Sequence, residues 1–310
     1  MVQIGSSDLE VAPLALGGNV FGWTADEAES FAVLDAFAGA GGTMVDTADA
    51  YSAWVPGHEG GESESVIGRW MADRGNRDRV VVATKVSQHP QFRGLSAANV
   101  RAAAQASLER LGTDRIDLYW AHFDDQDTPI EETAGAFSRL VDEGLVRWIG
   151  VSNYSPERID AWMAAAEADG LHRPVALQPH YNLVERAFEN GLRDRAERYR
   201  LGVLPYFSLA KGFLTGKYRD GAPAVDSPRA RQAQDYLDER GKRVLVALDQ
   251  VAGRHDVPVA TVALAWLRSR PTVAAPIASA RTADQLEPLL RSMTLTLPES
   301  DVDLLTAASV

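Results

Sequence analysis

The sequence predicts an α/β fold, a (β/α)₈ TIM barrel formed by a single domain over residues 1–310. Two observations lead to this prediction. Short apolar runs alternate with longer helical patterns along almost all of the 310 residues, and eight such pairs fit an eightfold barrel better than a doubly wound sheet. The apolar runs are also nearly continuous, as expected for parallel strands that are buried on both faces.

The elements follow one another at regular intervals. The expected strands are 13–17, 43–47, 80–85, 116–122, 146–152, 175–179, 202–206 and 273–277. The expected helices are 26–40, 62–73, 96–111, 130–143, 155–169, 185–200, 235–254, 258–269 and 282–291, with one more from Pro298. Thr24 and Ser155 are expected caps, because acidic residues or proline follow them. The polar segments 52–64 and 218–234 are expected to be long loops, the second of them mobile.

Composition excludes several classes of partner and site. The net charge is −12, with 31 basic and 43 acidic side chains, which argues against nucleic acid or an anionic membrane as a partner. There is no cysteine, so disulfides, thiolate chemistry and cysteine-bound zinc are excluded. No apolar run reaches the roughly 18 residues of a membrane span, and no signal peptide is visible. We therefore expect a cytoplasmic protein.

Polar side chains follow the ends of the predicted strands. Asp46 and Tyr51 stand in VDTADAY, Lys85 ends VVVATK, and His122 ends DLYWAH. In a barrel of this type the chemistry lies at the carboxyl ends of the strands. The polar residues at or just past those ends come from six different units: Asp46, Lys85, His122, Ser152 with Asn153, Gln178 and Tyr206.

The first four of these residues fit a proton donor for a carbonyl group that receives hydride. A free tyrosine has a pKa of about 10, and a nearby ammonium such as that of Lys85 lowers it. Asp46 would hold Lys85 charged, and a neutral His122 would orient the carbonyl oxygen beside Tyr51. Each residue alone is more often a cap, a packing residue or a solvated side chain, so the hypothesis depends on their convergence.

The order of these motifs resembles the aldo-keto reductase superfamily. VDTADAY, ATK, DLYWAH and GVSNY are followed by LQPHYNLVER, LPYFSLAKGFLTGKY and PIASARTADQL, which together span almost the whole chain. The resemblance implies a (β/α)₈ barrel that uses NADPH to reduce an aldehyde or ketone, with a small-molecule carbonyl substrate. It also implies that Asp46, Tyr51, Lys85 and His122 are the family's catalytic tetrad, with Tyr51 as the general acid.

The cofactor site is expected outside the usual dinucleotide motifs, since neither G-x-G-x-x-G nor a phosphate-binding P-loop follows the strands. Tyr206 offers a flat face for a nicotinamide. Lys211 and Lys217 stand in a glycine-containing stretch that suits an anion, and Arg281 would bind the 2′-phosphate of NADPH/NADP⁺. The cofactor residues implied by the resemblance are Ser152, Asn153, Gln178, Tyr206, Phe207, Leu209, Lys211, Gly212, Leu214, Gly216, Lys217, Ser279, Arg281 and Gln285.

The sequence departs from the family at two places on the cofactor side. Phe207-Ser208 stands where the family has Ser-Pro, and Pro288-Leu289 stands where Glu-Asn is frequent. On the substrate side, Trp23, Trp54 and Phe123 lie in predicted loops, where they either line a pocket or pack the loops. The short tail beyond Arg291 indicates an open site for a broad or small carbonyl substrate.

Three other interpretations remain. The first is an aldolase-like barrel with Lys85 as a Schiff-base nucleophile, which requires an uncharged lysine. The second is a metallohydrolase, although the six histidines form no metal-binding motif. The third is a nucleotide-sensing barrel that acts as a regulatory or binding subunit with little turnover, as the potassium-channel β subunits of this superfamily do. We expect a monomer or a weak homo-oligomer.

Overall fold

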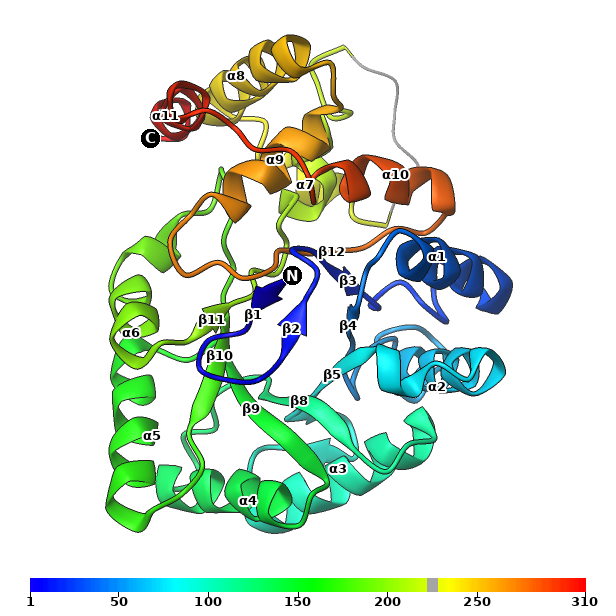
Figure 1. Cartoon of the computed structure of the whole chain (residues 1–310), viewed down its shortest axis with the longest axis vertical. Coiled ribbons are helices and arrows are strands. Elements are labelled where there is room, and N and C mark those ends of the chain that lie inside the picture. The colour runs from blue at the N-terminus through cyan, green and yellow to red at the C-terminus, as the bar shows by residue number, and fades with distance from the viewer. Residues whose placement is uncertain (222–227) are drawn as a thin grey trace.

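The computed structural model describes residues 1–221 and 228–310. It contains an eight-stranded parallel sheet with the order β11-β10-β9-β8-β5-β4-β3-β12, curled into a barrel (Figure 1), so the predicted fold class is confirmed. The strands are β3 (Ala15–Gly17), β4 (Met44–Asp46), β5 (Val81–Val86), β8 (Ile116–Ala121), β9 (Val146–Ser152), β10 (Pro174–Gln178), β11 (Gly202–Val203) and β12 (Ile277–Ala278).

The last strand brings the end of the chain back to its beginning. β12 pairs in parallel with β3 through Ile277 and Ala15, and the Ile277 amide donates to the carbonyl of Pro205, just past β11. A bridge between Val203 and Val273 adds a second link to β11. The predicted strand 273–277 therefore contributes one bridge at its start, and regular pairing with β3 begins only at Ile277.

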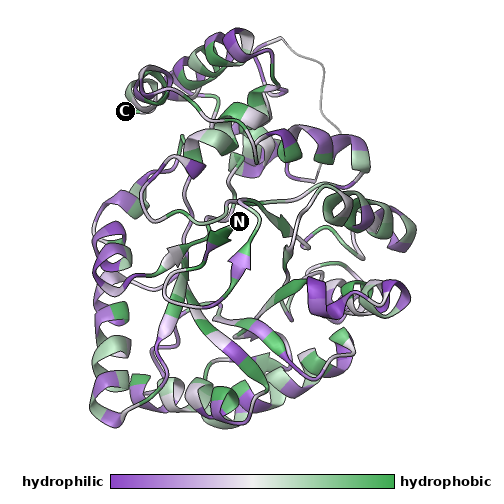
Figure 2. Ribbon diagram, viewed as in Figure 1, coloured by the Kyte–Doolittle hydropathy of each residue, from purple (hydrophilic) through white to green (hydrophobic). Residues whose placement is uncertain are grey.

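Helices surround the strands (Figure 1). They are α1 (Glu27–Gly39), α2 (Glu62–Arg74), α3 (Ala97–Leu111), α4 (Ile130–Asp142), α5 (Pro156–Asp169), α6 (Leu192–Tyr199), α7 (Ala230–Gln234), α8 (Glu239–His255), α9 (Val259–Arg268), α10 (Ala283–Arg291) and α11 (Glu299–Ala308), with 3₁₀ turns η1 (Arg77–Arg79), η2 (Ala187–Glu189) and η3 (Ala210–Thr215). In Figure 2 the outer helices carry both hydrophilic and hydrophobic bands, as helices with one buried face do.

Helix boundaries differ from the predicted ones at three places. The cap of α1 is Asp26, which forms a capping box with Glu29, so the prediction of Thr24 as the cap was wrong. The predicted helix 185–200 is interrupted by Gly191, whose φ of 90° lies in the left-handed region, and only Leu192–Tyr199 is α-helical. Of the predicted loop 218–234, Ala230–Gln234 is helical, and 222–227 lie outside the described residues. Ser155 caps α5 as expected, by accepting from the Arg158 amide.

The interior of the barrel is apolar, and a hairpin closes its amino-terminal end. Alternate strand residues such as Ala83 and Leu118 pack inside the barrel with Leu9 and Val11 of the hairpin. The hairpin strands β1 (Val2–Gln3) and β2 (Glu10–Val11) are antiparallel and lie across the centre of the barrel in Figure 1. A second antiparallel pair, β6 (Gln88–His89) and β7 (Phe92–Arg93), follows β5. Neither hairpin was predicted.

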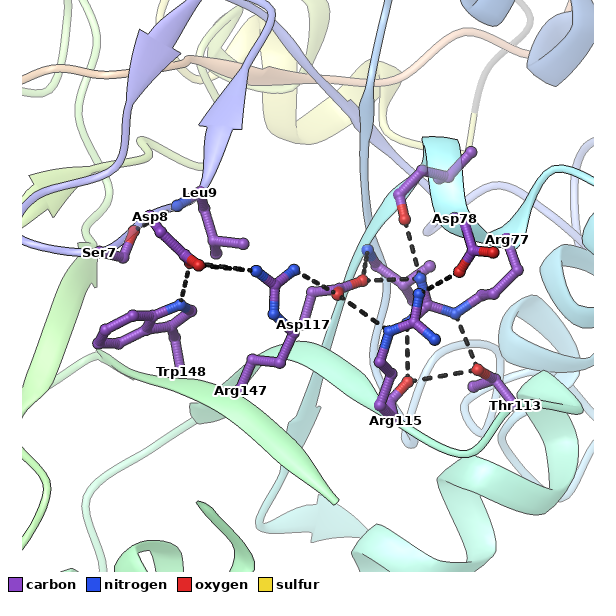
Figure 3. Close-up of polar contacts among 12 residues, drawn as sticks. Ser7, Asp8, Leu9, Arg77, Asp78, Thr113, Arg115, Asp117, Arg147 and Trp148 are labelled. Carbon is purple, nitrogen blue, oxygen red and sulfur yellow. Dashed lines mark hydrogen bonds and ion pairs between the residues drawn. The ribbon is translucent and has the colours of Figure 1, made fainter. Parts of the chain in front are cut away.

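An ionic network holds the hairpin to the strands (Figure 3). Its centre is Asp117 on β8, whose side chain is 2% exposed. Asp117 accepts from the Val82 amide at 2.9 Å and lies 2.9 Å from Arg77 and 3.1 Å from Arg147. Arg147 continues to Asp8 in the hairpin turn, 3.1 Å away. This network lies at the end of the barrel opposite the predicted site.

Within 1–221 and 228–310, no helix is long and apolar enough to cross a membrane.

Candidate active site

A cavity of about 850 Å³ opens at the carboxyl ends of the strands. Most residues that the sequence singled out line it: Trp23, Asp46, Tyr51, Trp54, His122, Phe123, Ser152, Asn153, Gln178, Tyr206, Phe207, Leu209, Lys211, Gly212, Lys217, Ser279, Arg281 and Gln285. Three others do not reach its wall. Lys85 lies beneath it, fully buried, Leu214 packs in the hydrophobic core, and Gly216 forms the left-handed turn that ends η3.

Lys85 is the centre of the predicted tetrad. Its ammonium nitrogen Nζ donates to Asp46 Oδ2 at 2.5 Å, to the Thr47 carbonyl at 2.7 Å and to Tyr51 Oη at 3.1 Å. These three bonds use all three hydrogens of a lysine ammonium. Burial lowers the pKa of Lys85, but the charge of Asp46 and the contact with Tyr51 more than offset this, so the pKa is raised. Lys85 is therefore a charged donor.

Asp46 is fixed from the side opposite Lys85. Its Oδ1 atom accepts from the indole of Trp120 at 3.0 Å and from the amide of Gln178 at 3.0 Å. Three N–H donors therefore surround this buried carboxylate and fix its position. Trp120 can reach Asp46 because its ring lies where a Cβ atom on Gly150 would stand. Neither contact was foreseen from the sequence.

Tyr51 presents its hydroxyl to the cavity. Because the oxygen already accepts from Lys85, its own hydrogen is directed elsewhere, and the residue lines the cavity. Burial raises the pKa of Tyr51, and the charge of Lys85 opposes this. The predicted lowering by Lys85 is present, but the predicted net direction was wrong, since burial of the phenol outweighs the ammonium.

His122 is an uncharged imidazole beside Tyr51. Burial, aided by the charge of Lys85, holds the pKa of His122 well below its ordinary value. The two rings lie 6.4 Å apart. Among the described residues, Nδ1 of His122 is buried without a hydrogen-bond partner. The residue itself lines the cavity, so its ring borders the space that a ligand would enter.

The polar residues at the ends of β9 and β10 form a connected set. Asn153, with a φ of 56°, donates through its amide to the His122 carbonyl and to Ser152 Oγ, and accepts from Tyr206 Oη at 2.8 Å. Ser152 in turn donates to the Gln178 carbonyl. A carbonyl oxygen accepts two hydrogen bonds, so Asn153 Oδ1 retains capacity for one more donor.

One face of the Tyr206 ring is covered by His180, and the residue also borders the cavity. The ring of His180 stacks against it at 5.2 Å, with 17° between the planes. Tyr206 itself lines the cavity. His180 thus fixes the orientation of the tyrosine ring from behind, a role that the sequence analysis did not assign.

The chain after Tyr206 has an unusual backbone. Positive φ angles occur at Phe207 (50°), Ala210 (47°), Lys211 (58°) and Gly212 (100°). Such conformations are costly for residues other than glycine and gather at functional sites. Successive amides in a turn of this kind make an anion-binding concavity. Lys211 also lies in the cavity wall, 5.4 Å from the Phe207 ring.

Positive charge gathers at the far end of the cavity. Burial and the nearby Arg281 lower the pKa of Lys217, so the two cations are close enough to repel. Within the part of the chain that the structure describes, no carboxylate forms an ion pair with Lys211, Lys217 or Arg281. Gln285 accepts from the Arg281 amide at 3.1 Å, which ties the loop after β12 to α10. This region is suited to an anion.

Aromatic side chains form the outer rim. Trp23 and Trp54 meet edge to face at 5.4 Å, and Trp54 lies 6.2 Å from the Tyr51 ring. Phe123 lies against His122 at 5.0 Å. Trp54 is 53% exposed and Phe123 41% exposed, so the rim presents apolar surface around the hydroxyl of Tyr51.

Arg229, which was not among the predicted site residues, lines the cavity from the turn before α7. Its guanidinium lies 5.5 Å from the Phe207 ring and contacts Asn19 once the Asn19 amide is oriented to donate to Ser279. Burial lowers the pKa of Arg229, and Tyr51 opposes this. Arg229 stands in a segment predicted only as a loop, and the basic pair in PRAR was the available signal.

Comparison with known proteins agrees with this geometry. The profile of the Aldo/keto reductase family matches residues 13–310. The chain is 34% identical to the aldo-keto reductase YhdN of Bacillus subtilis, over 96% of this chain and 88% of that protein. It is 30% identical to norsolorinic acid reductase of Aspergillus flavus, over 96% of this chain and 77% of that protein.

A relative that is named as a channel subunit has the same percentage identity to this chain as YhdN. The chain is 34% identical to a probable voltage-gated potassium channel subunit beta of Oryza sativa, over 92% of this chain and 88% of that protein. The profile match covers nearly the whole chain, and each of the three relatives is at least 30% identical to it. The chain therefore belongs to the aldo/keto reductase family of NAD(P)H-dependent oxidoreductases.

Proposed function

We propose that this protein reduces an aldehyde or ketone to an alcohol, with hydride from NADPH and the proton from Tyr51. The observation that carries the proposal is the bond from Lys85 Nζ to Tyr51 Oη at the floor of the cavity. It leaves the tyrosine hydrogen available to a ligand, and a charged Lys85 stabilises the phenolate that remains after the proton has moved.

The residues around the cavity fit a nicotinamide cofactor. Tyr206 offers an aromatic surface backed by His180, and Asn153 Oδ1 has capacity for an amide N–H. When bound there, the reduced nicotinamide supplies hydride to the carbonyl carbon. Lys211 and the strained turn beside it would hold the diphosphate, together with Arg229, whose guanidinium lies near the same Phe207 ring as the Lys211 ammonium.

His122 and Tyr51 would hold the carbonyl oxygen between them. A neutral imidazole has one N–H donor, and the Tyr51 hydroxyl is the second donor. Two donors aimed at an oxygen that gains negative charge stabilise the alkoxide-like transition state. The low pKa of His122 keeps it uncharged at neutral pH, so Tyr51 and not His122 provides the proton.

The charged state of Lys85 opposes an aldolase-like function. A Schiff-base nucleophile must be a free amine, whereas Lys85 donates three hydrogen bonds and has a raised pKa. Borohydride treatment in the presence of a carbonyl substrate is therefore expected to leave Lys85 unmodified.

The proposal is tested by assaying a panel of aromatic and aliphatic carbonyl compounds with NADPH and with NADH. We expect steady-state consumption of NADPH with formation of the matching alcohol. The aromatic rim formed by Trp23, Trp54 and Phe123 favours the aromatic members of the panel. Tight NADPH binding without turnover of any member would instead support a regulatory subunit.

Arg281 is expected to set the preference for NADPH. A charge-assisted bond to phosphate contributes about 1.5–3 kcal/mol, so replacing Arg281 with Ala is predicted to raise the Kd for NADPH about 10- to 100-fold. The Kd for NADH should change little, because NADH has no 2′-phosphate. Fluorescence titration measures both constants. Arg231→Ala is the control, since Arg231 is exposed and does not line the cavity. Equal weakening of both cofactors by Arg281→Ala would contradict this role.

A further inference from the structure

Asp49 is a buried carboxyl group that the proposed reaction does not use. It stands between Asp46 and Tyr51 in the turn after β4, and it is 0% exposed. Among the described residues, neither oxygen of its side chain accepts a well-aligned hydrogen bond, although the Ala50 amide lies close enough to lower the pKa of the carboxyl group. It does not line the cavity. A carboxylate buried in this way is costly unless it is paired.

Among the described residues, no neighbouring cation forms an ion pair with Asp49, and both nearby cations bind other carboxylates. Glu64 at the start of α2 is also 0% exposed, and its two oxygens accept from Thr84 Oγ1 at 2.5 Å and from Arg110 Nε at 2.7 Å. The cation nearest to Asp49 on the helix side is therefore bound to another carboxylate. On the barrel side, Lys85 has all three hydrogens on other acceptors.

The remaining titratable groups around Asp49 do not compensate its charge. The hydroxyl of Tyr119 on β8 is buried without a partner, and the pKa of Tyr119 is raised by burial and by Asp49. The ring of His89 on β6 packs on the same loop, next to Gly60, and burial lowers the pKa of His89. With two carboxylates and Arg110, the cluster would carry a net negative charge in a dry environment.

We propose that Asp49 is held as an uncharged carboxylic acid and positions the turn that carries Tyr51. With its proton, the cluster of Asp49, Glu64 and Arg110 has no net charge. The acid hydrogen can also be donated to a neighbouring oxygen, which a carboxylate cannot do. Burial and the charge of Glu64 raise the pKa of Asp49 well above its ordinary value, in agreement with the geometry.

The backbone connects Asp49 to the tetrad. The Asp49 amide donates to the Lys85 carbonyl at 3.3 Å, and the Tyr51 amide donates to the Ala48 carbonyl at 3.3 Å. The Thr47 carbonyl accepts from Lys85 Nζ. Ionisation of Asp49 would repel Glu64 and force this turn open toward water. Tyr51 and the Thr47 carbonyl, which accepts from Lys85, would then move together.

The sign of the pH dependence follows from the raised pKa. The folded protein keeps a proton on Asp49 that the unfolded chain releases near its ordinary value of about 4. Between that pH and the raised pKa the folded state binds the extra proton, so stability falls as pH rises. This contribution is fully present at acidic pH and is lost as the pH increases through that interval.

Infrared spectroscopy of the wild-type protein tests the protonation state directly. At neutral pH we expect a carbonyl stretching band of a protonated carboxylic acid that shifts on deuteration. The band should be absent from Asp49→Asn and present in Glu59→Gln, a control that removes an exposed acid from the same loop. Absence of the band from the wild-type protein, or its persistence in Asp49→Asn, would overturn the proposal without any need for the variant to be active.

The pH profiles test the positioning role. Asparagine has nearly the shape of the neutral acid, so Asp49→Asn should retain kcat at neutral pH within about 3-fold. Its melting temperature should fall less than that of the wild type as the pH is raised from about 4, by the effect of one proton. The alkaline limb of its kcat profile should move to higher pH, whereas Glu59→Gln should leave both profiles unchanged. Unaltered profiles in Asp49→Asn would refute the positioning role.

The kcat measurement rests on the proposed function, whereas the infrared and melting measurements do not. A protein that reduces no carbonyl compound but shows the band and the shifted melting profile would refute the proposed reaction alone. A protein that turns over but lacks the band would refute the role of Asp49 alone.

Discussion

Replacing Tyr51 with Phe is expected to lower kcat by about 10²–10⁴, the range that a general acid contributes. Phenylalanine keeps the ring that packs against Trp54 at 6.2 Å but removes the hydroxyl oxygen to which Lys85 donates. Binding of NADPH should remain within about 3-fold of the wild-type value, since Tyr51 is not among the proposed cofactor contacts. Single-turnover kinetics and titration calorimetry measure the two effects separately.

The matched control is Tyr154→Phe, which removes the same hydroxyl from a buried tyrosine whose oxygen has no partner among the described residues and which does not line the cavity. This variant should retain its turnover. If Tyr51→Phe also retained full activity, another group would have to be the acid, and the proposed roles of Lys85 and His122 would fail with it.

Replacing Asp117 with Asn is expected to destabilise the protein by about 3 kcal/mol, the cost of leaving a buried cation uncompensated. Arg77, only 16% exposed, would lose its ion-pair partner at 2.9 Å. Arg147 would keep Asp8, which places the expected cost at the lower end of the range for buried pairs. Denaturant unfolding followed by circular dichroism measures the change.

Asp114→Asn is the control for Asp117. Asp114 pairs with Arg115 of the same network, but its side chain is 86% exposed, so its removal should hardly change the unfolding midpoint. Turnover of the folded Asp117→Asn protein should equal that of the wild type, because the network lies at the amino-terminal end of the strands. A loss of turnover without a loss of stability would contradict this assignment.

The strands, and the meeting of the four proposed tetrad residues at one end of the barrel, could be predicted from the sequence because both depend on local patterns. Continuous apolar runs mark strands buried on both faces, and a parallel barrel brings the residues that end them to one rim. This is why Asp46, Lys85 and His122 were found without knowledge of any contact. The hairpin over residues 2–11 was missed because its strands have two residues each, too few to show a period.

Properties that depend on the surroundings of a side chain could not be predicted. The net pKa of Tyr51 depends on how deeply the phenol is buried, which no residue spacing reveals. Gln178 was expected to serve only a cofactor, yet it also donates to Asp46, a contact across 132 residues. Arg229 and Asp49 could not be predicted for the same reason, because the surroundings that give them their importance are formed by other segments of the chain.

The pairing of β12 with β3 has a consequence for synthesis of the chain in the cell. β3 is among the first strands to leave the ribosome, and its partner β12 is the last. Until then β3 and β11 are open edges with unpaired backbone groups, which readily pair with strands of other chains. Contacts between distant parts of a sequence also form slowly. The nascent protein is therefore most exposed to aggregation until β12 has been synthesised, and chaperones that shield strand edges should matter most for its yield before that point.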